Sequence, residues 1–265
     1  MNINWGRLFA ATIICLILLF VSKQTYAVNV KTYIPKNAYK YLDLVEEEQN
    51  RLLPTFPFPF YFDGLIEHES CISLTHSRCW NPKSRLKTKR EEGAGVGQLT
   101  RAYRSNGSLR FDSLKELRDR NREELEELSW SNIYSRPDLQ IRAIILMTRS
   151  NWNFLYIIDD SYERLAMADA AYNGGLGGVR KERRACGLAA NCNPQLWFNN
   201  VERYCMKSKR ILYANRNACD INRHHVTDVL EKRMPKYEKY YKDHRNQSRT
   251  AVDQQDDVDH KSITH

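Results

Sequence analysis

The chain has 265 residues, of which 42% are hydrophobic and 15 are tyrosine; this apolar content supplies a packed core and excludes a wholly disordered protein. The formal net charge is +9 and the pI is about 9.2, which favours an anionic partner such as nucleic acid, a membrane surface or an acidic cell-wall polymer. Because the basic residues are spread over the chain and form no single stripe, nucleic acid is the weakest of these candidates, and we expect no nucleic-acid partner.

The N-terminus contains a short apolar run. Arg7 precedes an uncharged segment from Leu8 to Val21, which is shorter than the ~20 residues of a membrane-spanning helix and suits a secretory signal. Thr25 and Ala27 lie at the spacing that a signal peptidase prefers, so we expect cleavage after Ala27. The alternative is an uncleaved membrane anchor over 1–27. Under either interpretation the rest of the chain lies outside the cytoplasm.

The cysteines agree with export. Six cysteines follow Cys15, and an even number in an exported chain predicts disulfides, although the sequence does not select their connectivity. A metal site is the rival interpretation, but no Cys-x-x-Cys pair is present and His224 and His225 lack matching ligands, so we expect no metal. The simplest pairing joins sequence neighbours: Cys71 with Cys79, Cys186 with Cys192, and Cys205 with Cys219.

Helical periodicity dominates the rest of the chain. Apolar residues predict a helix within 37–54, followed by a proline-rich segment, and we assign this leading helix and linker to 28–57. The segment 64–70, "GLIEHES", predicts a helix that ends near Cys71. A polar, glycine-bearing loop with one short element at 96–99 is expected next.

The second half of the chain predicts further helices. A charged amphipathic helix begins near Asp112 or Ser113, and Pro137 suits the first turn of a long apolar helix. Another helix is expected from Asp160 or Ser161 to Gly174 or Gly175, and two more within 193–210 and 226–241. Residues 243–265 lack apolar periodicity and predict a disordered tail. The fold class is therefore mostly α, with little or no β-sheet.

One acid stands out within the apolar segment 64–70. On a helix, Glu69 shares a face with Leu65 and Ile66, whereas Glu67 and His68 point elsewhere. Partial desolvation favours the protonated carboxyl group, which suits a proton donor near neutral pH. Taken alone, the segment fits equally an acid that is paired with one of the many nearby cations.

Two glycine clusters follow. Gly93, Gly95 and Gly97 allow the backbone to approach a ligand closely, but their spacing is not that of a dinucleotide-binding motif. The segment 170–175, "AAYNGG", ends a predicted helix and presents an aromatic ring and an amide, a pair that suits sugar recognition. Each cluster by itself is a turn or a helix cap.

The order of three motifs carries a resemblance. Glu69-Ser70, "GAGVGQ" at 93–98 and "AYNGG" at 171–175 together resemble the lytic transglycosylases of the lysozyme superfamily, over roughly residues 58–179. The details are most similar to murein transglycosylases of phages and mobile elements. The chain departs from the family pattern at Arg90, where the family has serine, and Glu91 or Glu92 is the candidate to fill that place.

The resemblance implies a fold and a location. It implies a lysozyme-like helical domain of the goose-type or lytic-transglycosylase kind over 58–242, with a helical C-terminal extension. It also implies a monomer without cofactor or metal that acts on peptidoglycan glycan strands. The expected location is the periplasm, the periplasmic face of the inner membrane through the N-terminal apolar segment, or a phage particle.

The resemblance also implies a reaction. Glu69 is expected to cleave the bond between N-acetylmuramic acid and N-acetylglucosamine, leaving a 1,6-anhydro end without consuming water. Gln98 and Tyr172 are expected to hold the substrate, and Asn173 to bind near its acetamide group. Ser70 and Glu91 complete the expected substrate-binding set.

Two alternatives remain open at this point. A goose-type hydrolytic lysozyme on the same fold needs a second acid, for which Glu91 or Glu92 is the candidate. A non-catalytic wall-binding module, or an assembly module of a secretion system or phage, retains the fold without the chemistry.

Overall fold

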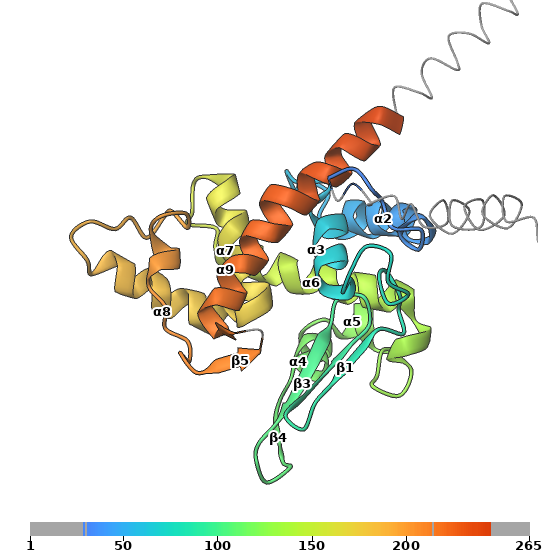
Figure 1. Ribbon diagram of the computed structural model, residues 1–265, viewed down its shortest axis with the longest axis horizontal. Helices are drawn as coiled ribbons and strands as arrows, with labels where there is room; N and C mark the ends of the chain where they lie inside the picture. The colour runs from blue at the N-terminus through green and yellow to red at the C-terminus, as the bar shows by residue number, and fades with distance from the viewer. Residues whose placement is uncertain (1–28, 30, 214, 245–265) are drawn as a thin grey trace, which may run out of the picture. The chain divides into compact units, whose positions relative to one another are not determined.

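The computed structural model describes residue 29, residues 31–213 and residues 215–244 (Figure 1). The expected signal segment 1–27 lies outside these ranges, as does nearly all of the expected tail 243–265. The chain divides into a unit that ends at Tyr33 and a second compact unit that begins at Ile34. All elements named below belong to the second unit. No helix in the described ranges combines the length and apolarity needed to cross a membrane.

The structure is about 53% helical, which confirms the mostly-α class. The α-helices are α2 (Leu42–Leu52), α3 (Tyr61–Ser70), α4 (Ser113–Arg120), α5 (Arg122–Leu125), α6 (Pro137–Phe154), α7 (Ser161–Gly174), α8 (Leu176–Gly187) and α9 (Ala218–Asp228). Short 3-10 turns occupy η1 (Ala38–Lys40), η2 (Ile133–Ser135) and η3 (Val201–Arg203), and α9 continues through the π-helical turn η4 (Val229–Arg233) into a helix over 234–244.

The expectation of little or no β-sheet was wrong. Four antiparallel strands pair in the order β1 (Arg85–Lys87), β2 (Glu91–Ala94), β3 (Leu99–Tyr103) and β4 (Leu109–Asp112), and a small hairpin pairs β5 (Ile211–Tyr213) with β6 (Arg216–Asn217). The sequence does not predict β1 and β2, because these strands contain charged residues and a glycine at positions where strands usually contain β-branched residues. Cross-strand ion pairs compensate, since Glu92 accepts hydrogen bonds from Arg85 on β1 and from Arg101 on β3.

Local capping explains the two helices that the sequence predicts best. Pro137 occupies the first turn of α6, where its missing N–H is not needed. The Asp160 side chain caps α7 by accepting hydrogen bonds from the backbone N–H groups of Tyr162 and Glu163. Gly175, with φ of 83°, ends α7 as predicted.

Gly175 also precedes a helix, α8, that was not predicted from the sequence. The positive φ turns the chain so that α8 starts at the next residue, Leu176, with no loop between the two helices. The helix that we expected within 193–210 is absent, and only the short turn η3 forms there. The Asn193 side chain accepts from the backbone N–H of Gln195, and Asn200 accepts from that of Asn193, so asparagine-to-backbone bonds replace the helical ladder.

The charged helix after the sheet is shorter than its pattern suggests. The helix α4 begins at Ser113, as predicted, and Asp112 caps it by accepting a hydrogen bond of 2.9 Å from the backbone N–H of Lys115. The helix then breaks at Asn121, whose backbone leaves the helical region, and α5 begins at the next residue. Leu114 and Leu117 of α4 and Leu125 of α5 are buried. The charged residues of α4 are exposed or half-buried, and two of them, Glu116 and Arg120, also line the cavity described below.

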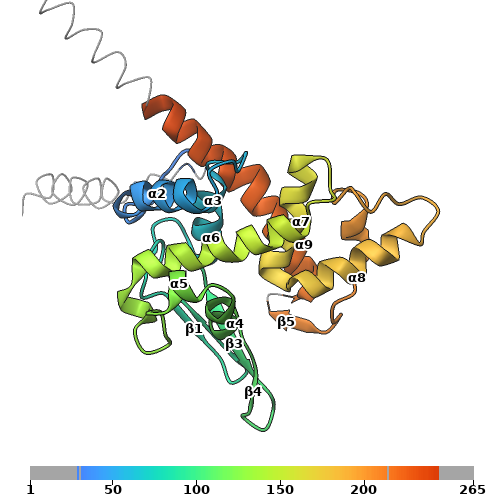
Figure 2. The ribbon, with the colours of Figure 1, turned by 180° about the vertical axis from the view of Figure 1, so that it is seen from behind.

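The helix α6 forms the centre of this unit. In both views it crosses the middle of this unit, with the four-stranded sheet and α4 towards one end and α7, α8 and α9 towards the other (Figures 1 and 2). Its buried residues Ile144 and Ile145 belong to the main core, to which Leu42 and Val45 of α2 also belong. The leading helix is therefore part of the same compact unit and does not form a separate linker region.

The three disulfides join sequence neighbours, which confirms the simplest pairing. The bonds Cys71–Cys79, Cys186–Cys192 and Cys205–Cys219 close short segments of the chain. The last of them joins cysteines that are 14 residues apart, and both strands of the β5–β6 hairpin lie between these cysteines. Each disulfide thus fixes a local loop against the helical core.

Candidate active site

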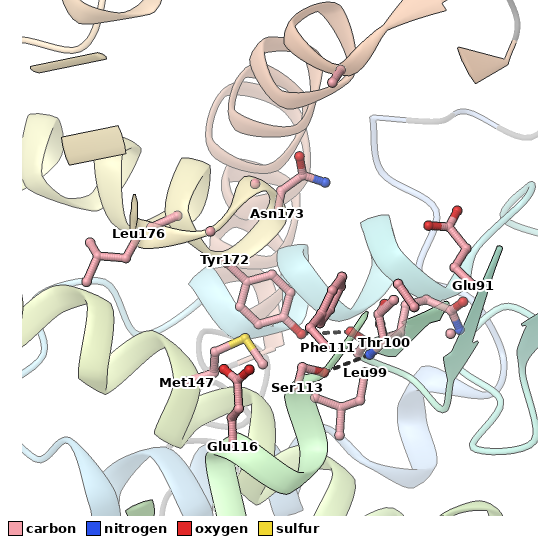
Figure 3. A pocket seen from close by; sticks show the side chains of 18 of the residues that line it. Glu91, Leu99, Thr100, Phe111, Ser113, Glu116, Met147, Tyr172, Asn173 and Leu176 are labelled. Carbon is pink, nitrogen blue, oxygen red and sulfur yellow. Dashed lines mark hydrogen bonds between the residues drawn. The ribbon is translucent and has the colours of Figure 1, made fainter. Parts of the chain in front are cut away.

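A cavity of about 1080 Å³ lies between the sheet and the helices α6, α7 and α9. The end of α3, the loop between β2 and β3, the junction of α7 with α8 and the β5–β6 hairpin all contribute to its lining. Figure 3 shows Tyr172 and Asn173 at the end of α7, and Glu91, which comes from the sheet. Of the predicted site residues, the lining contains Glu69, Glu91, Gln98, Tyr172 and Asn173. The structure therefore brings together residues that are far apart in the sequence.

Glu69 lies in the last turn of α3, and its side chain is 15% exposed. Its Oε1 atom is 2.8 Å from Nε2 of His225 on α9. The sequence left open that Glu69 pairs with a nearby cation, and in the structure its partner is the imidazole of His225. One carboxylate oxygen is held by an imidazole, while the residue itself lines the cavity.

His225 belongs to a longer chain of buried hydrogen bonds. Its Nδ1 lies 2.7 Å from Oδ2 of Asp169 on α7, and the Tyr61 hydroxyl donates to Oδ1 of Asp169 at 2.8 Å. The side chains of His225 and Asp169 are 1% and 0% exposed. The first residue of α3, the middle of α7 and the end of α9 are thus joined behind Glu69.

The charge of the buried His225 side chain follows from its neighbours. Burial alone disfavours the imidazolium, but the neighbouring carboxylates Asp169 and Glu69 outweigh burial and raise the pKa of His225 to about 10. Burial raises the pKa of Tyr61 as well, and the charge of Asp169 adds to that effect, so the phenol remains a hydrogen-bond donor. At neutral pH the group carries an imidazolium between two acids.

Neither His225 nor Asp169 was predicted as a site residue. The sequence suggested His225 only as a rejected metal ligand and suggested no role for Asp169. Asp169 had a signal of the same kind as Glu69, because it lies in the run "AMADAAY", where an acid is surrounded by apolar residues on both sides. For His225 the sequence offered no local signal, since its partners are 56 and 156 residues away.

Tyr172 connects α7 with the loop between β2 and β3. Its hydroxyl donates to the carbonyl oxygen of Gly97 at 2.8 Å, and its ring stacks on His225 at a centroid distance of 6.3 Å. Burial raises the pKa of Tyr172, and the charges of Glu69 and Asp169 raise it further, so the hydroxyl stays protonated. Tyr172 thus lines the cavity and also fixes the loop opposite α7.

The glycines 93, 95 and 97 make room for side chains of the protein itself. A Cβ atom on Gly93 would lie 2.7 Å from Oε1 of Gln98, and one on Gly97 would lie 2.3 Å from Cγ1 of Ile144. Gly95 has a φ of 75° and faces the Gln140 side chain. We expected these glycines to admit a ligand. Their immediate role in the structure is to let Gln98, Gln140 and Ile144 pack closely.

Two amide side chains at the cavity, Gln98 and Asn173, each have one amide atom hydrogen-bonded within the protein. Nε2 of Gln98 donates to the carbonyl oxygen of Gly95 at 2.8 Å. Oδ1 of Asn173 accepts from Nδ2 of Asn222 at 3.1 Å, and Asn222 is itself fixed by a bond to the carbonyl oxygen of Ala170. Because its oxygen is engaged, Asn173 presents its N–H groups, which suits a carbonyl acceptor on a ligand.

Ser70 lies outside the lining of this cavity. Its buried hydroxyl donates to the carbonyl oxygen of Ile66 at 2.7 Å and accepts from the backbone N–H of Trp80 at 2.9 Å. These bonds fasten the end of α3 to the segment that the Cys71–Cys79 disulfide closes. The substrate-binding role expected of Ser70 is therefore replaced by a structural one.

The neighbouring acids Glu91 and Glu92 lie in different environments. Glu91 lines the cavity, whereas Glu92 is 3% exposed and bound to Arg85 and Arg101. Burial acts to raise the pKa of Glu92, but the two guanidinium groups outweigh burial and lower it. Of these two acids, only Glu91 lines the cavity as a candidate second carboxylate.

Glu67 corrects the helical-face argument. It was expected to point away from the apolar side, yet it is 1% exposed and more buried than Glu69. It faces the helix after η4, where Lys236 donates to Oε1 at 2.6 Å and the Tyr237 hydroxyl donates to Oε2 at 2.8 Å. Both faces of α3 are covered, so periodicity alone could not separate its acids.

Comparisons with known proteins add no relative. No protein-family model matches the chain, and no match was found among curated proteins. Within the described ranges, no group of three or more His, Cys, Asp or Glu side chains is arranged to hold a metal ion. The interpretation of the site therefore depends on its geometry and on the sequence motifs.

Proposed function

We propose that the chain is a lytic transglycosylase that cleaves peptidoglycan glycan strands, with Glu69 as the acid and base. The observation that supports this most is that Glu69, Gln98, Tyr172 and Asn173, which the three motifs supply, line one cavity. A cavity of about 1080 Å³ has room for several sugar rings. Known lysozyme-like enzymes use such a groove, and on this proposal the chain has their fold.

The reaction needs one carboxyl group. Protonated Glu69 donates its proton to the oxygen that links N-acetylmuramic acid to N-acetylglucosamine, and the bond from that oxygen to the anomeric carbon breaks. The acetamide of the muramic residue stabilises the positive charge at that carbon. Glu69, now a carboxylate, takes the proton of the C6 hydroxyl, whose oxygen bonds to the anomeric carbon and closes the 1,6-anhydro ring. No water is consumed, and the site regains the proton that it gave to the leaving oxygen.

The cavity lining suits this substrate. The N–H groups of Asn173 can donate to a carbonyl acceptor such as the acetamide oxygen, and Tyr172 supplies an aromatic wall. Murein carries carboxylates on its peptides and lactyl groups, and cations around the cavity attract such an anionic polymer. The basic residues in the lining are Arg90, Arg110, Arg120, Lys207 and Arg210.

The proposed location is outside the cytoplasm. Three disulfides fit an oxidising compartment such as the periplasm, where murein lies. Anchoring to the inner membrane through the N-terminal apolar segment, or association with a phage, would bring the enzyme to the same polymer.

A second candidate is hydrolysis by a goose-type lysozyme mechanism, with Glu91 as a second acid. The observation that favours it is that Glu91 lines the same cavity as Glu69. The two reactions differ by one water in their products, because hydrolysis leaves a reducing end where transglycosylation leaves an anhydro ring.

The deciding experiment is digestion of purified murein by the exported part of the chain, followed by mass spectrometry of the fragments. We expect anhydro ends from the wild type, and we expect Glu69→Gln to lower the rate at least ~100-fold, because the amide cannot deliver a proton. Glu91→Gln separates the two reactions, because transglycosylation does not use Glu91 as an acid and anhydro ends should still form. Reducing ends together with a loss of activity in Glu91→Gln would favour hydrolysis. Undiminished cleavage by Glu69→Gln would exclude both enzymes and leave a wall-binding module.

A further inference from the structure

Behind Glu69, the structure holds a set of buried polar groups that the one-carboxyl mechanism does not use. Four side chains follow one another through hydrogen bonds: Glu69, His225, Asp169 and Tyr61, with distances of 2.8, 2.7 and 2.8 Å. Burying an imidazole, a carboxylate and a phenol costs free energy unless the groups satisfy one another. Here each inner group has a partner on both sides, so the arrangement is complete.

The positions of the protons follow from the partners. Asp169 accepts from the Tyr61 hydroxyl through Oδ1, and its Oδ2 therefore accepts from Nδ1–H of His225. With Nδ1 protonated, the remaining contact joins Nε2 of His225 to Oε1 of Glu69. One proton lies in that contact. It belongs either to an imidazolium beside a carboxylate or to a carboxylic acid beside a neutral imidazole.

We propose that His225 stores the proton that Glu69 delivers to the glycosidic oxygen, and that Asp169 is the positioning residue that sets the tautomer of His225. This inference deepens the proposed function and rests on it. Neither His225 nor Asp169 lines the cavity, so both act through Glu69.

The step is balanced in protons. The imidazolium passes the Nε2 proton to Oε1 of Glu69, which leaves a neutral imidazole that still donates Nδ1–H to Asp169. The terminal torsion of a glutamate is broad, so the carboxyl group can turn its O–H towards the cavity and protonate the leaving oxygen. The proton that Glu69 later takes from the C6 hydroxyl returns to Nε2. The four hydrogen-bonded side chains thus have the same protonation state at the end of each turnover as at its start.

The surroundings isolate this store from other acids and bases. His68 of α3 lies against His225 with ring centroids 4.4 Å apart, but it is held by Asp228 at 2.7 Å, and Asp228 is also bonded to Arg233. His68 therefore has its own acid and does not compete for Asp169. The titratable and charged groups around His225 are Tyr61, His68 and Glu69 from α3, Asp169 and Tyr172 from α7, and Asp228 and Arg233 beyond His68.

The store predicts a particular pH dependence. Because the two acids raise the pKa of His225 to about 10, the proton stays on the set far above the pH at which a solvated glutamate loses its own. Activity should therefore persist into alkaline solution and fall only as the pH approaches that value. Without His225, Glu69 must take its proton from solvent.

The test compares pH profiles of murein cleavage for wild type, His225→Gln and Asp169→Asn, with His224→Gln as the matched control. We expect His225→Gln to lose roughly 100-fold in rate and to have its alkaline limit moved down by about one pH unit or more. Asp169→Asn should shift the limit in the same direction, and His224→Gln should keep both the rate and the limit. A profile for His225→Gln that superimposes on that of the wild type overturns the inference.

A second measurement needs no substrate and guards against a variant that fails to fold. Nitrogen-15 NMR of the free wild-type protein should show His225 protonated on both ring nitrogens at neutral pH, and in Glu69→Gln the same ring should titrate at lower pH. A neutral His225 ring, or a ring that titrates identically in both proteins, overturns the store even if murein is cleaved. Failure of the wild type to cleave murein instead overturns the proposed function and, with it, the catalytic role of the store.

Discussion

At the scale of single residues, Gly97 shows how closely this site is packed. A Cβ atom there would lie 2.3 Å from Cγ1 of Ile144 and 2.8 Å from the hydroxyl oxygen of Tyr172. The backbone of Gly97 is not in the left-handed region, so the requirement for glycine comes from space and not from conformation. The residue lets the β2–β3 loop meet α6 and α7 at once, which places Tyr172 against His225.

Gly97→Ala should therefore lower both stability and activity. Overpacking of this kind costs about 1–3 kcal/mol, and displacement of the Tyr172 ring should slow murein cleavage. Gly177→Ala is the matched control, because nothing lies within 4 Å of its Cβ position and α8 favours alanine over glycine. Urea unfolding and murein digestion measure both effects. Equal stability of the two variants would show that the loop yields without strain.

At the scale of elements, the β5–β6 hairpin forms one wall of the cavity. Lys207, Ser208, Arg210 and Leu212 from this segment line it, and the disulfide Cys205–Cys219 closes the segment at its base. Lys207 is also bound to the buried Glu182 at 3.0 Å. The hairpin is thus positioned by one covalent and one ionic contact rather than by a large apolar face.

Removal of that disulfide should affect substrate binding more than the fold. We expect Cys205→Ser with Cys219→Ser to raise KM for murein, because the wall of the cavity loses its closure. The pair Cys186→Ser with Cys192→Ser is the matched control, since neither cysteine lines the cavity. The control should lose about 2–5 kcal/mol of stability and keep its KM. A KM that is unchanged in both would mean that the hairpin does not touch the glycan.

At the scale of the whole molecule, ion pairs between distant elements hold the helices together. Glu48 of α2 is bound to Arg142 of α6 at 2.6 Å, and Asp228 of α9 is bound to His68 of α3 at 2.7 Å. Burial acts to raise the pKa of each of these acids, but Arg142 and Arg51 lower that of Glu48, and His68 and Arg233 lower that of Asp228. The charged forms of both acids thus stabilise the folded state.

The stability of the protein should depend on pH in both directions. Acids with a lowered pKa stabilise the fold above their usual values of 4.5 and 3.8, and that contribution is lost as the pH falls below this range. His225 has a raised pKa, so its contribution is complete below its usual value of 6.5 and is lost as the pH rises towards about 10. Urea unfolding from acid to alkaline pH should give a maximum between these limits. A curve that stays level at alkaline pH would contradict the charged state of His225.

Local signals in the sequence predicted much of the helical framework and the catalytic candidate. The helix start near Asp112, Asp160 as a cap, Pro137 in a first turn and Gly175 as a stop each depend on neighbouring residues, so the sequence alone was sufficient. The disulfides also join sequence neighbours, but the sequence did not select among the possible pairings, and the structure did. Glu69 was found because an acid in an apolar segment is costly whatever the fold.

Only the tertiary structure decided the sheet and the buried partners of Glu69. The strands β1 and β2 form because Glu92 pairs with arginines on both sides, and no single strand contains that information. His225 and Asp169 reach Glu69 through contacts that span 156 and 56 residues, and Ser70 becomes structural because Trp80 meets it. Caps and periodicity depend on residues a turn apart, whereas pairing and burial depend on which distant elements pack together, and that information exists only once the chain has folded.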